Sequence, residues 1–190
     1  AIFIMRLFIS GHDKFFNHNE KKSSNGNIIL ATTGTMFLSA DTCTSNSQIR
    51  YDDYFREIYR IIKSLNGKKL IVKSHPSQIL RKIVQDLINE LDASITLVEN
   101  TDNQELFSDC DMVITFNNST TALEALSLGT PVISLQTESW ALEDDIAQSD
   151  AIVSISNLSD CESSITKILN DSEFRKNLVR NGYRFLSYYM

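Results

Sequence analysis

The chain has few cysteines, and their spacing excludes two common ways of stabilising a small protein. Cys43, Cys110 and Cys161 are widely separated, odd in number and never arranged as C-x-x-C. A disulfide framework is built from an even set of cysteines, and a zinc site needs ligands at short, characteristic spacings. We therefore expect three reduced thiols, which is typical of a cytoplasmic protein.

Positive charge is also scarce. Eighteen Lys and Arg residues stand against twenty-four Asp and Glu residues, which gives 190 residues a net charge of −6. Nucleic acids and anionic membranes bind mainly to basic surfaces, so neither is expected as the main ligand. The stretch from Ile2 to Ile9 is too short to span a bilayer and is interrupted by Arg6. An anionic ligand must therefore be bound locally, by a few well-placed groups.

Two absent motifs concern cofactors. The loop from Thr32 to Thr35 lacks a full G-x-G-x-x-G, which argues against a dinucleotide bound in the usual way. The only D-x-D, Asp109-Cys110-Asp111, precedes a predicted strand, so we expect it to be a solvated lead-in at the edge opposite the ligand loops. No carboxylate pair is then left to hold a divalent cation on a diphosphate, and we expect neither a metal nor another cofactor.

One stretch predicts a complete β-α-β unit. Met112 to Phe116 is a short apolar run, as in a strand buried on both faces of a parallel sheet. Ser119 or Thr120 can cap the helix that follows, and Gly129 ends it. Val132 to Leu135 is the next buried strand, so the unit is expected to be right-handed.

The rest of the chain repeats this alternation, with 42% hydrophobic and 22% charged residues as in an ordinary globular domain. The other predicted strands are 28–31, 70–72, 95–98 and 152–155, and the other predicted helices are 49–65, 78–91, 105–107, 141–147, 161–169 and 173–183. The pattern predicts an α/β fold, a Rossmann-like, doubly wound, parallel six-stranded sheet in the order 3-2-1-4-5-6.

The domain boundary is expected near residue 27. We assign 28–190 to a single Rossmann-like domain and 1–27 to an interdomain segment or the tail of a missing N-terminal domain. Ala1 opens the chain in the middle of an apolar run, and Gly11 to Asn27 is polar, as in a linker. We therefore expect a piece of a longer protein.

Polar residues follow the predicted strands where ligands of such sheets bind. They are Thr33, Gly34 and Thr35 after the first strand, Lys73, His75 and Pro76 after the second, Glu99 after the third, Asn118, Ser119, Thr120 and Thr121 after the fourth, and Glu124 one turn later. Hydroxyls, cations and a helix amino terminus suit an anion, and Glu124 can accept hydrogen bonds from sugar hydroxyls. From the residues alone, helix capping and a structural His75 remain equally open.

These motifs together resemble the carboxyl-terminal, donor-binding domain of GT-B-fold glycosyltransferases. The nearest group includes CDP-glycerol glycerophosphotransferases, capsule polysaccharide transferases and some sialyltransferases, which carry K-x-H-P and a later S-T-x-x-x-E-A followed by G-x-P-V-I. This chain matches at Lys73, His75, Pro76, Ser119, Thr120, Glu124, Ala125, Gly129, Pro131, Val132 and Ile133. The resemblance extends over about residues 28–135.

The resemblance implies a function. His75, Ser119 and Thr120 would hold the phosphates of a nucleotide-activated sugar or polyol donor, and Glu124 would face the ribose or the sugar. An N-terminal acceptor-binding domain would supply the catalytic base, which is not assigned here, so this chain alone is expected to be inactive. The product would be a surface polysaccharide, with the full-length protein cytoplasmic and free to associate with the inner face of the membrane.

Two alternatives stay open. A sugar-nucleotide 2-epimerase shares this fold, although resemblance to that family would require Ser-Gly-Gly where this chain has Asn118-Ser119-Thr120. A nucleotide-binding α/β module without chemistry of its own would present the same edge. Receiver-like modules are disfavoured, because no predicted strand ends in the acidic residues and phosphorylatable Asp that they need.

Overall fold

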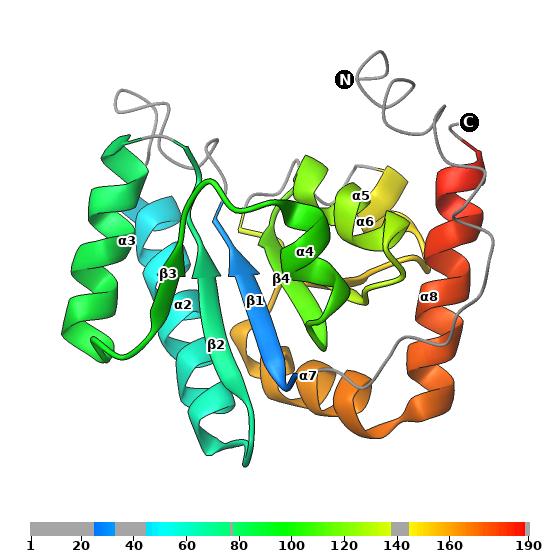
Figure 1. Ribbon diagram of the computed structural model, residues 1–190, viewed down its shortest axis with the longest axis horizontal. Helices are drawn as coiled ribbons and strands as arrows, with labels where there is room; N and C mark the ends of the chain where they lie inside the picture. Colours follow the sequence, from blue (N-terminus) through cyan, green and yellow to red (C-terminus); the bar gives the residue numbers. More distant parts are fainter. Residues whose placement is uncertain (1–24, 33–44, 77, 138–144, 189–190) are drawn as a thin grey trace.

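The computed structural model of this protein describes residues 25–32, 45–76, 78–137 and 145–188. They form one parallel six-stranded sheet in the order β3-β2-β1-β4-β5-β6, which confirms the predicted fold class and strand order (Figure 1). The strands are β1 (Asn27–Ala31), β2 (Lys69–Lys73), β3 (Thr96–Val98), β4 (Met112–Phe116), β5 (Val132–Leu135) and β6 (Val153–Ile155).

Helices connect the strands. They are α2 (Ser45–Ser64), α3 (Gln78–Leu91), α4 (Asn103–Ser108), α5 (Thr120–Ser127), α6 (Asp145–Gln148), α7 (Cys161–Asn170) and α8 (Ser172–Ser187), with a 3₁₀ turn, η3 (Leu158–Asp160). The predicted helix 78–91 is confirmed as α3. The helix predicted over 105–107 begins earlier because the Asp102 side chain caps it, accepting from the Gln104 N–H at 2.9 Å. Residues 141–144 of another predicted helix lie outside the described residues.

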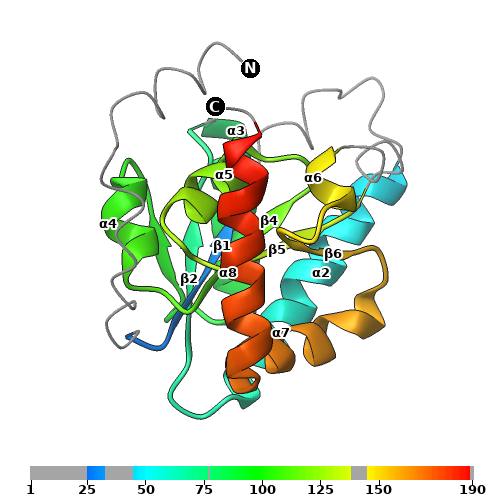
Figure 2. The same ribbon diagram turned by 90° about the vertical axis from the view of Figure 1, so that its right-hand side faces the viewer.

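Each face of the sheet carries its own apolar core. Met112, Ile114 and Phe116 of β4 pack toward α2, α3 and α7, whereas Val113 packs toward α4, α5 and the carboxyl end of α8. Figure 2 shows α4 and α2 on opposite sides of the sheet. All five residues of β4 are buried, which explains why this strand is a continuous apolar run rather than an alternating one.

β1 lies at the point where the winding of the sheet reverses. Ile29 pairs with Ile71 of β2 on one side and with Val113 of β4 on the other. Open α/β sheets bind ligands beyond the carboxyl ends of the strands at such a point. In Figure 1 these ends lie at the top, so β1, β2 and β4 define where a ligand is expected.

The D-x-D segment lies at the opposite edge, as predicted. The Asp111 N–H donates to the carbonyl of Asn27 at 2.7 Å, and its carboxylate pairs with Lys68 at 2.7 Å. The expectation that this lead-in is solvated is wrong for Asp111, which is buried, because Lys68 folds over the strand start and compensates its charge. Among the described residues, no helix is long and apolar enough to cross a membrane.

Two glycines let α8 approach α5 closely. Gly129 ends α5 with a φ of +67°, and a β-carbon there would lie 2.5 Å from the Tyr183 hydroxyl oxygen. A β-carbon on Gly182 of α8 would lie 2.9 Å from a methyl carbon of Leu126. The absence of a side chain at these two positions therefore lets α5 pack closely against α8, and this packing also fixes the loop between β4 and α5.

We expect Gly129→Ala to lower the free energy of unfolding by roughly 2 kcal/mol, since alanine is strained at positive φ and its methyl group overlaps Tyr183. Gly67→Ala is the matched control. Gly67 has a φ of +72° but no neighbour within 4 Å of a β-carbon, so only the backbone strain of about 1 kcal/mol should appear. Urea denaturation of both variants measures the difference, and equal losses would contradict the packing role of Gly129.

Candidate functional site

Thr32 fastens the carboxyl ends of β1 and β2 together. Its N–H donates to the carbonyl of Lys73 at 3.0 Å, and its hydroxyl donates to the same carbonyl at 3.3 Å. The hydroxyl oxygen also accepts from the His75 N–H at 2.8 Å. The backbone that carries Lys73 and His75 is therefore fixed by one buried side chain of the neighbouring strand.

Asn117 fastens the ends of β4 and β5 in the same way. It has a φ of +49°, which turns the chain out of β4, and its N–H donates to the carbonyl of Leu135 at 2.9 Å. Its side-chain oxygen accepts from the Thr137 N–H at 2.9 Å, and its side-chain nitrogen donates to the Thr137 hydroxyl at 2.8 Å. The carbonyl of Asn117 accepts from the Ser134 hydroxyl at 2.8 Å, so Asn117 joins the end of β4 to β5 and to Thr137 beyond it through both its backbone and its side chain.

The amino terminus of α5 opens onto this edge. Ser119 is the N-cap, and its side-chain oxygen accepts from the Thr121 N–H at 3.3 Å, a contact worth about 1 kcal/mol. Of the two capping residues that the sequence allows, the structure uses Ser119. A hydroxyl that accepts one hydrogen bond still has a proton to donate, so capping does not prevent Ser119 from binding an anion. Thr120 is exposed beside it.

The candidate residues after β2 lie one strand beyond β1. Lys73 ends β2, and both Lys73 and His75 are half-buried, whereas Pro76 is exposed. Ser74 between them is buried, and its N–H donates to the carbonyl of Val98 in β3 at 3.0 Å. The candidates predicted after β1, namely Thr33, Gly34 and Thr35, lie outside the described residues.

Glu99, the candidate at the end of β3, forms an ion pair with Arg81 of α3. The Nε and one Nη of Arg81 each donate a hydrogen bond to one of the two carboxylate oxygens of Glu99. This pairing compensates the charge of the carboxylate, and it ties the end of β3 to the helix before it.

Glu124, one turn into α5, contacts a residue that the sequence did not indicate. Its Oε2 accepts from the side-chain Nδ2 of Asn103, the first residue of α4. Asn103 Oδ1 is buried and has no hydrogen-bond partner among the described residues, a cost of about 1–3 kcal/mol. The contact links the helix before β4 to the helix after it.

A buried aromatic layer supports the edge from below. Tyr51 of α2 is fully buried, and its ring lies 4.5 Å from that of Phe116, the last residue of β4. Burial raises the pKa of Tyr51 above its ordinary value, and the neighbouring Asp52 carboxylate raises it further. The Tyr51 hydroxyl therefore stays neutral at physiological pH and adds no charge beneath the site.

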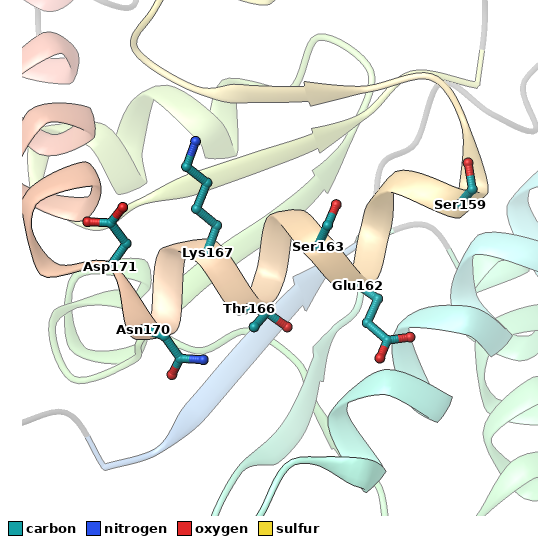
Figure 3. Close-up of a pocket in the computed structure, with 7 residues that line it drawn as sticks. All are labelled: Ser159, Glu162, Ser163, Thr166, Lys167, Asn170 and Asp171. Carbon is teal, nitrogen blue, oxygen red and sulfur yellow. The ribbon is translucent and has the colours of Figure 1, made fainter.

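A shallow hollow on α7 lies at the other end of the sheet and does not converge on a ligand. Its lining residues are Ser159, Glu162, Ser163, Thr166, Lys167, Asn170 and Asp171, and Figure 3 shows that they project to both sides of the helix. Glu162 pairs with Arg60 at 2.8 Å, and the Lys167 ammonium lies 4.1 Å from the centre of the Phe174 ring. Within the part of the chain that the structure describes, no group of three or more His, Cys, Asp and Glu side chains is placed to hold a metal.

Sequence reasoning placed Thr32 and Asn117 in loops at the ligand edge but did not foresee that they join strand ends, and it missed Asn103 and Thr137 altogether. A weak signal exists for Asn117, because asparagine directly after a buried strand is one of the few residues that tolerate positive φ. Asn103 and Thr137 contact residues 21 and 20 positions away, and local sequence patterns carry no information about such pairs.

Solved structures with the same fold include glycosyltransferases and epimerases. The C-terminal domain of a glycosyl transferase group 1 family protein (LpcC) from Francisella tularensis superposes with a TM-score of 0.56 at 15% identity, over 87% of this chain and 86% of that one. A putative UDP-N-acetylglucosamine 2-epimerase from Listeria monocytogenes gives a TM-score of 0.58 at 16% identity, over 86% of this chain and 43% of that one. The structure of TarM gives a TM-score of 0.60 at 15% identity, over 87% of this chain and 32% of that one.

At these identities the likeness shows the fold alone, a Rossmann-like α/β domain that the LpcC C-terminal domain, the epimerase and TarM all contain. The chain spans less than half the length of the epimerase and of TarM. No curated protein sequence matches it significantly.

A family match goes beyond the fold. The sequence matches the family described as LIC12162 family transferase over residues 8–149, about three quarters of the chain. The matched region begins inside the predicted segment 1–27 and includes every candidate site residue from Thr33 to Glu124. The chain therefore belongs to the LIC12162 family of transferases.

Proposed function

We propose that this chain is the donor-binding domain of a GT-B-type transferase. It binds a nucleotide-activated sugar or polyol beyond the carboxyl ends of β1, β2 and β4. A second, acceptor-binding domain of the same protein supplies the catalytic base, and the full-length enzyme works in the cytoplasm at the inner face of the membrane on a surface polysaccharide.

The observation that carries this proposal is the placement of two groups on either side of β1. Lys73 and His75 follow β2, and the amino terminus of α5 with Ser119 and Thr120 follows β4. Neighbouring strands are about 4.8 Å apart, so the two groups are separated by about 10 Å, which a nucleoside diphosphate with its attached group can bridge. Cations on one side and hydroxyls with helix N–H groups on the other suit its phosphates.

This arrangement can assist the chemistry of transfer without a metal. When the bond to the transferred group breaks, negative charge develops on the nucleotide leaving group. Donors that are already fixed in place stabilise that charge without reorganising. Thr32 and Asn117 provide this fixing, because each joins two strand ends through its side chain.

The donor class is a finer part of the proposal. Solved structures of the same fold include an epimerase bound to UDP-GlcNAc and MnaA with UDP, which makes uridine nucleotides the first to test. The K-x-H-P and S-T-x-x-x-E-A motifs favour the group that also uses CDP-glycerol, so cytidine nucleotides come next. Glu124 is proposed to accept hydrogen bonds from the ribose or sugar hydroxyls.

The 2-epimerase alternative shares the fold and is testable separately. Several structures of similar fold are UDP-N-acetylglucosamine 2-epimerases. Incubation with UDP-GlcNAc followed by proton NMR would show a second set of anomeric signals if the chain, joined to the proposed second domain, epimerises the sugar. The Asn118-Ser119-Thr120 loop makes transfer the preferred proposal.

We expect the chain to bind a nucleoside diphosphate without added metal, because helix N–H groups, hydroxyls and cations suffice to hold two phosphates. Isothermal titration with UDP, CDP, GDP and ADP, each with and without EDTA, measures this. At least one nucleotide should bind with the same affinity in both conditions. Binding that EDTA abolishes and magnesium restores would contradict a metal-independent site.

The chain alone should bind its donor but not transfer from it, because the acceptor and the base lie on the proposed second domain. Release of free nucleotide from UDP-GlcNAc and CDP-glycerol in the presence of polysaccharide acceptors is the measurement. Transfer to any of these acceptors by the isolated 190-residue chain would contradict the proposal that the acceptor site and the catalytic base lie on a second domain.

His75→Ala should weaken nucleotide binding roughly ten- to a hundred-fold, since it removes a charge-assisted hydrogen bond to a phosphate. Lys69→Ala, an exposed change at the opposite end of β2, is the control and should leave affinity unchanged. If His75 is only structural, the melting temperature falls instead and the affinity stays the same.

A further inference from the structure

Asn103 and Glu124 form a contact between the two helices that flank β4 in sequence. Asn103 opens α4, before β4, and its Nδ2 donates to Oε2 of Glu124 on α5, after β4. Glu124 is half-buried, and its Oε1 accepts no hydrogen bond from any residue that the structure describes. Among the described residues, one carboxylate oxygen is therefore held and the other accepts no hydrogen bond.

The direction of the contact is set by charge. Asn103 Oδ1 is buried without a partner in the described part of the chain. Exchanging the positions of the amide oxygen and nitrogen would place two acceptors, the amide oxygen and the Glu124 carboxylate, against each other. It would also bury the amide N–H donors without a partner, so the observed orientation is the more favourable one. The chain thus retains a buried unpaired carbonyl in order to present an N–H group to this carboxylate.

Glu124 is placed to reach a ligand at the edge. Thr120 and Thr121 precede it by four and three residues, so the three side chains share one face of α5. That face begins at the helix amino terminus, beside the carboxyl end of β4. A carboxylate held in one rotamer there can accept two hydrogen bonds from neighbouring hydroxyls of a ligand, whereas a freely rotating one loses entropy on binding.

We propose that Asn103 is a positioning residue for donor recognition: it orients the Glu124 carboxylate toward the vicinal hydroxyls of the nucleotide's ribose. This inference rests on the proposed function, since it assigns Glu124 to the donor. Asn103 itself touches no ligand. Its effect is on selectivity for hydroxyls, not on phosphate binding.

The test measures the affinities of the 190-residue chain for a ribonucleoside diphosphate and for its 2′-deoxy form. The base is that of the tightest binder among UDP, CDP, GDP and ADP. Asn103→Ala should weaken binding of the ribonucleotide roughly tenfold and leave the deoxynucleotide nearly unchanged, so that the preference for ribose falls. In a Glu124→Gln background, Asn103→Ala should have little further effect, because the two residues act as one unit.

Asn103→Asp adds a second carboxylate and should also reduce the preference for ribose at neutral pH. The matched control is Asn89→Asp on the exposed face of α3, which adds the same charge far from the site and should change neither affinity. Melting temperatures of all variants identify any that fail to fold, and Glu124→Gln then reports on the same contact from its other side.

The outcomes separate the two levels of inference. If the unaltered chain binds none of the four nucleotides, the proposed function fails. If the unaltered chain binds and prefers ribose, but Asn103→Ala keeps that preference while losing stability, Asn103 only links α4 to α5 and the positioning role is overturned. If Asn103→Ala lowers both affinities equally, Asn103 supports phosphate binding instead and the proposal is also wrong.

Discussion

The parallel pairing of all six strands is the constraint on which the rest of this structure depends. Parallel strands bring every carboxyl end to one edge, so the loops that leave these ends bring residues far apart in sequence to the edge where ligands of open α/β sheets bind. The winding of the sheet reverses at β1, the point where open α/β sheets bind ligands between the two neighbouring connections. His75 and Ser119, 44 positions apart in the numbering, share an edge for this reason alone.

The edge is held rigid by side chains that hydrogen-bond to the backbone of the neighbouring strand. Thr32 joins β1 to β2, and Asn117 joins β4 to β5, each through at least two hydrogen bonds in a buried position. Such bonds are worth only about 1 kcal/mol each to stability, but they fix the position of the loop backbone at this edge. Rigid, correctly aimed donors are what an anionic leaving group needs. Fold stability and site geometry therefore draw on the same residues.

Capping and ligand binding are compatible at the start of α5. Ser119 caps the helix through its oxygen, and the same hydroxyl retains a proton for an anion. Capping by Ser119, which the structure shows, therefore does not exclude the proposed role of Ser119 in binding an anion. Glu99 shows the opposite case, because the Arg81 guanidinium engages both oxygens of its carboxylate. A polar residue that follows a strand is a candidate for the site. The hydrogen bonds it already makes within the chain decide which of its atoms are still available to a ligand.

Apolar periodicity and turn residues in the sequence were sufficient for the fold. The run from Met112 to Phe116 and the break at Gly129 to Pro131 predicted β4, α5 and β5 to within one or two residues, because burial on both faces and helix termination are local properties of the chain. The same patterns indicated which loops meet at one edge. They also placed Asp109-Cys110-Asp111 at the far edge, although its burial depends on Lys68, 43 positions away.

Only the tertiary structure decided which side chains are hydrogen-bond or ion-pair partners. Asn103 faces Glu124, Arg81 faces Glu99 and Asn117 faces Thr137 because helices and loops from separate connections pack side by side. Contacts of this kind depend on distances and directions across the sheet. Hydrophobic periodicity and turn residues carry no information about these distances and directions. The sequence by itself determined the sheet, its order and the loops at its carboxyl edge. The orientation of the carboxylates and the rigidity of those loops arise only when the layers pack, since the partners are brought together by the fold and not by the chain.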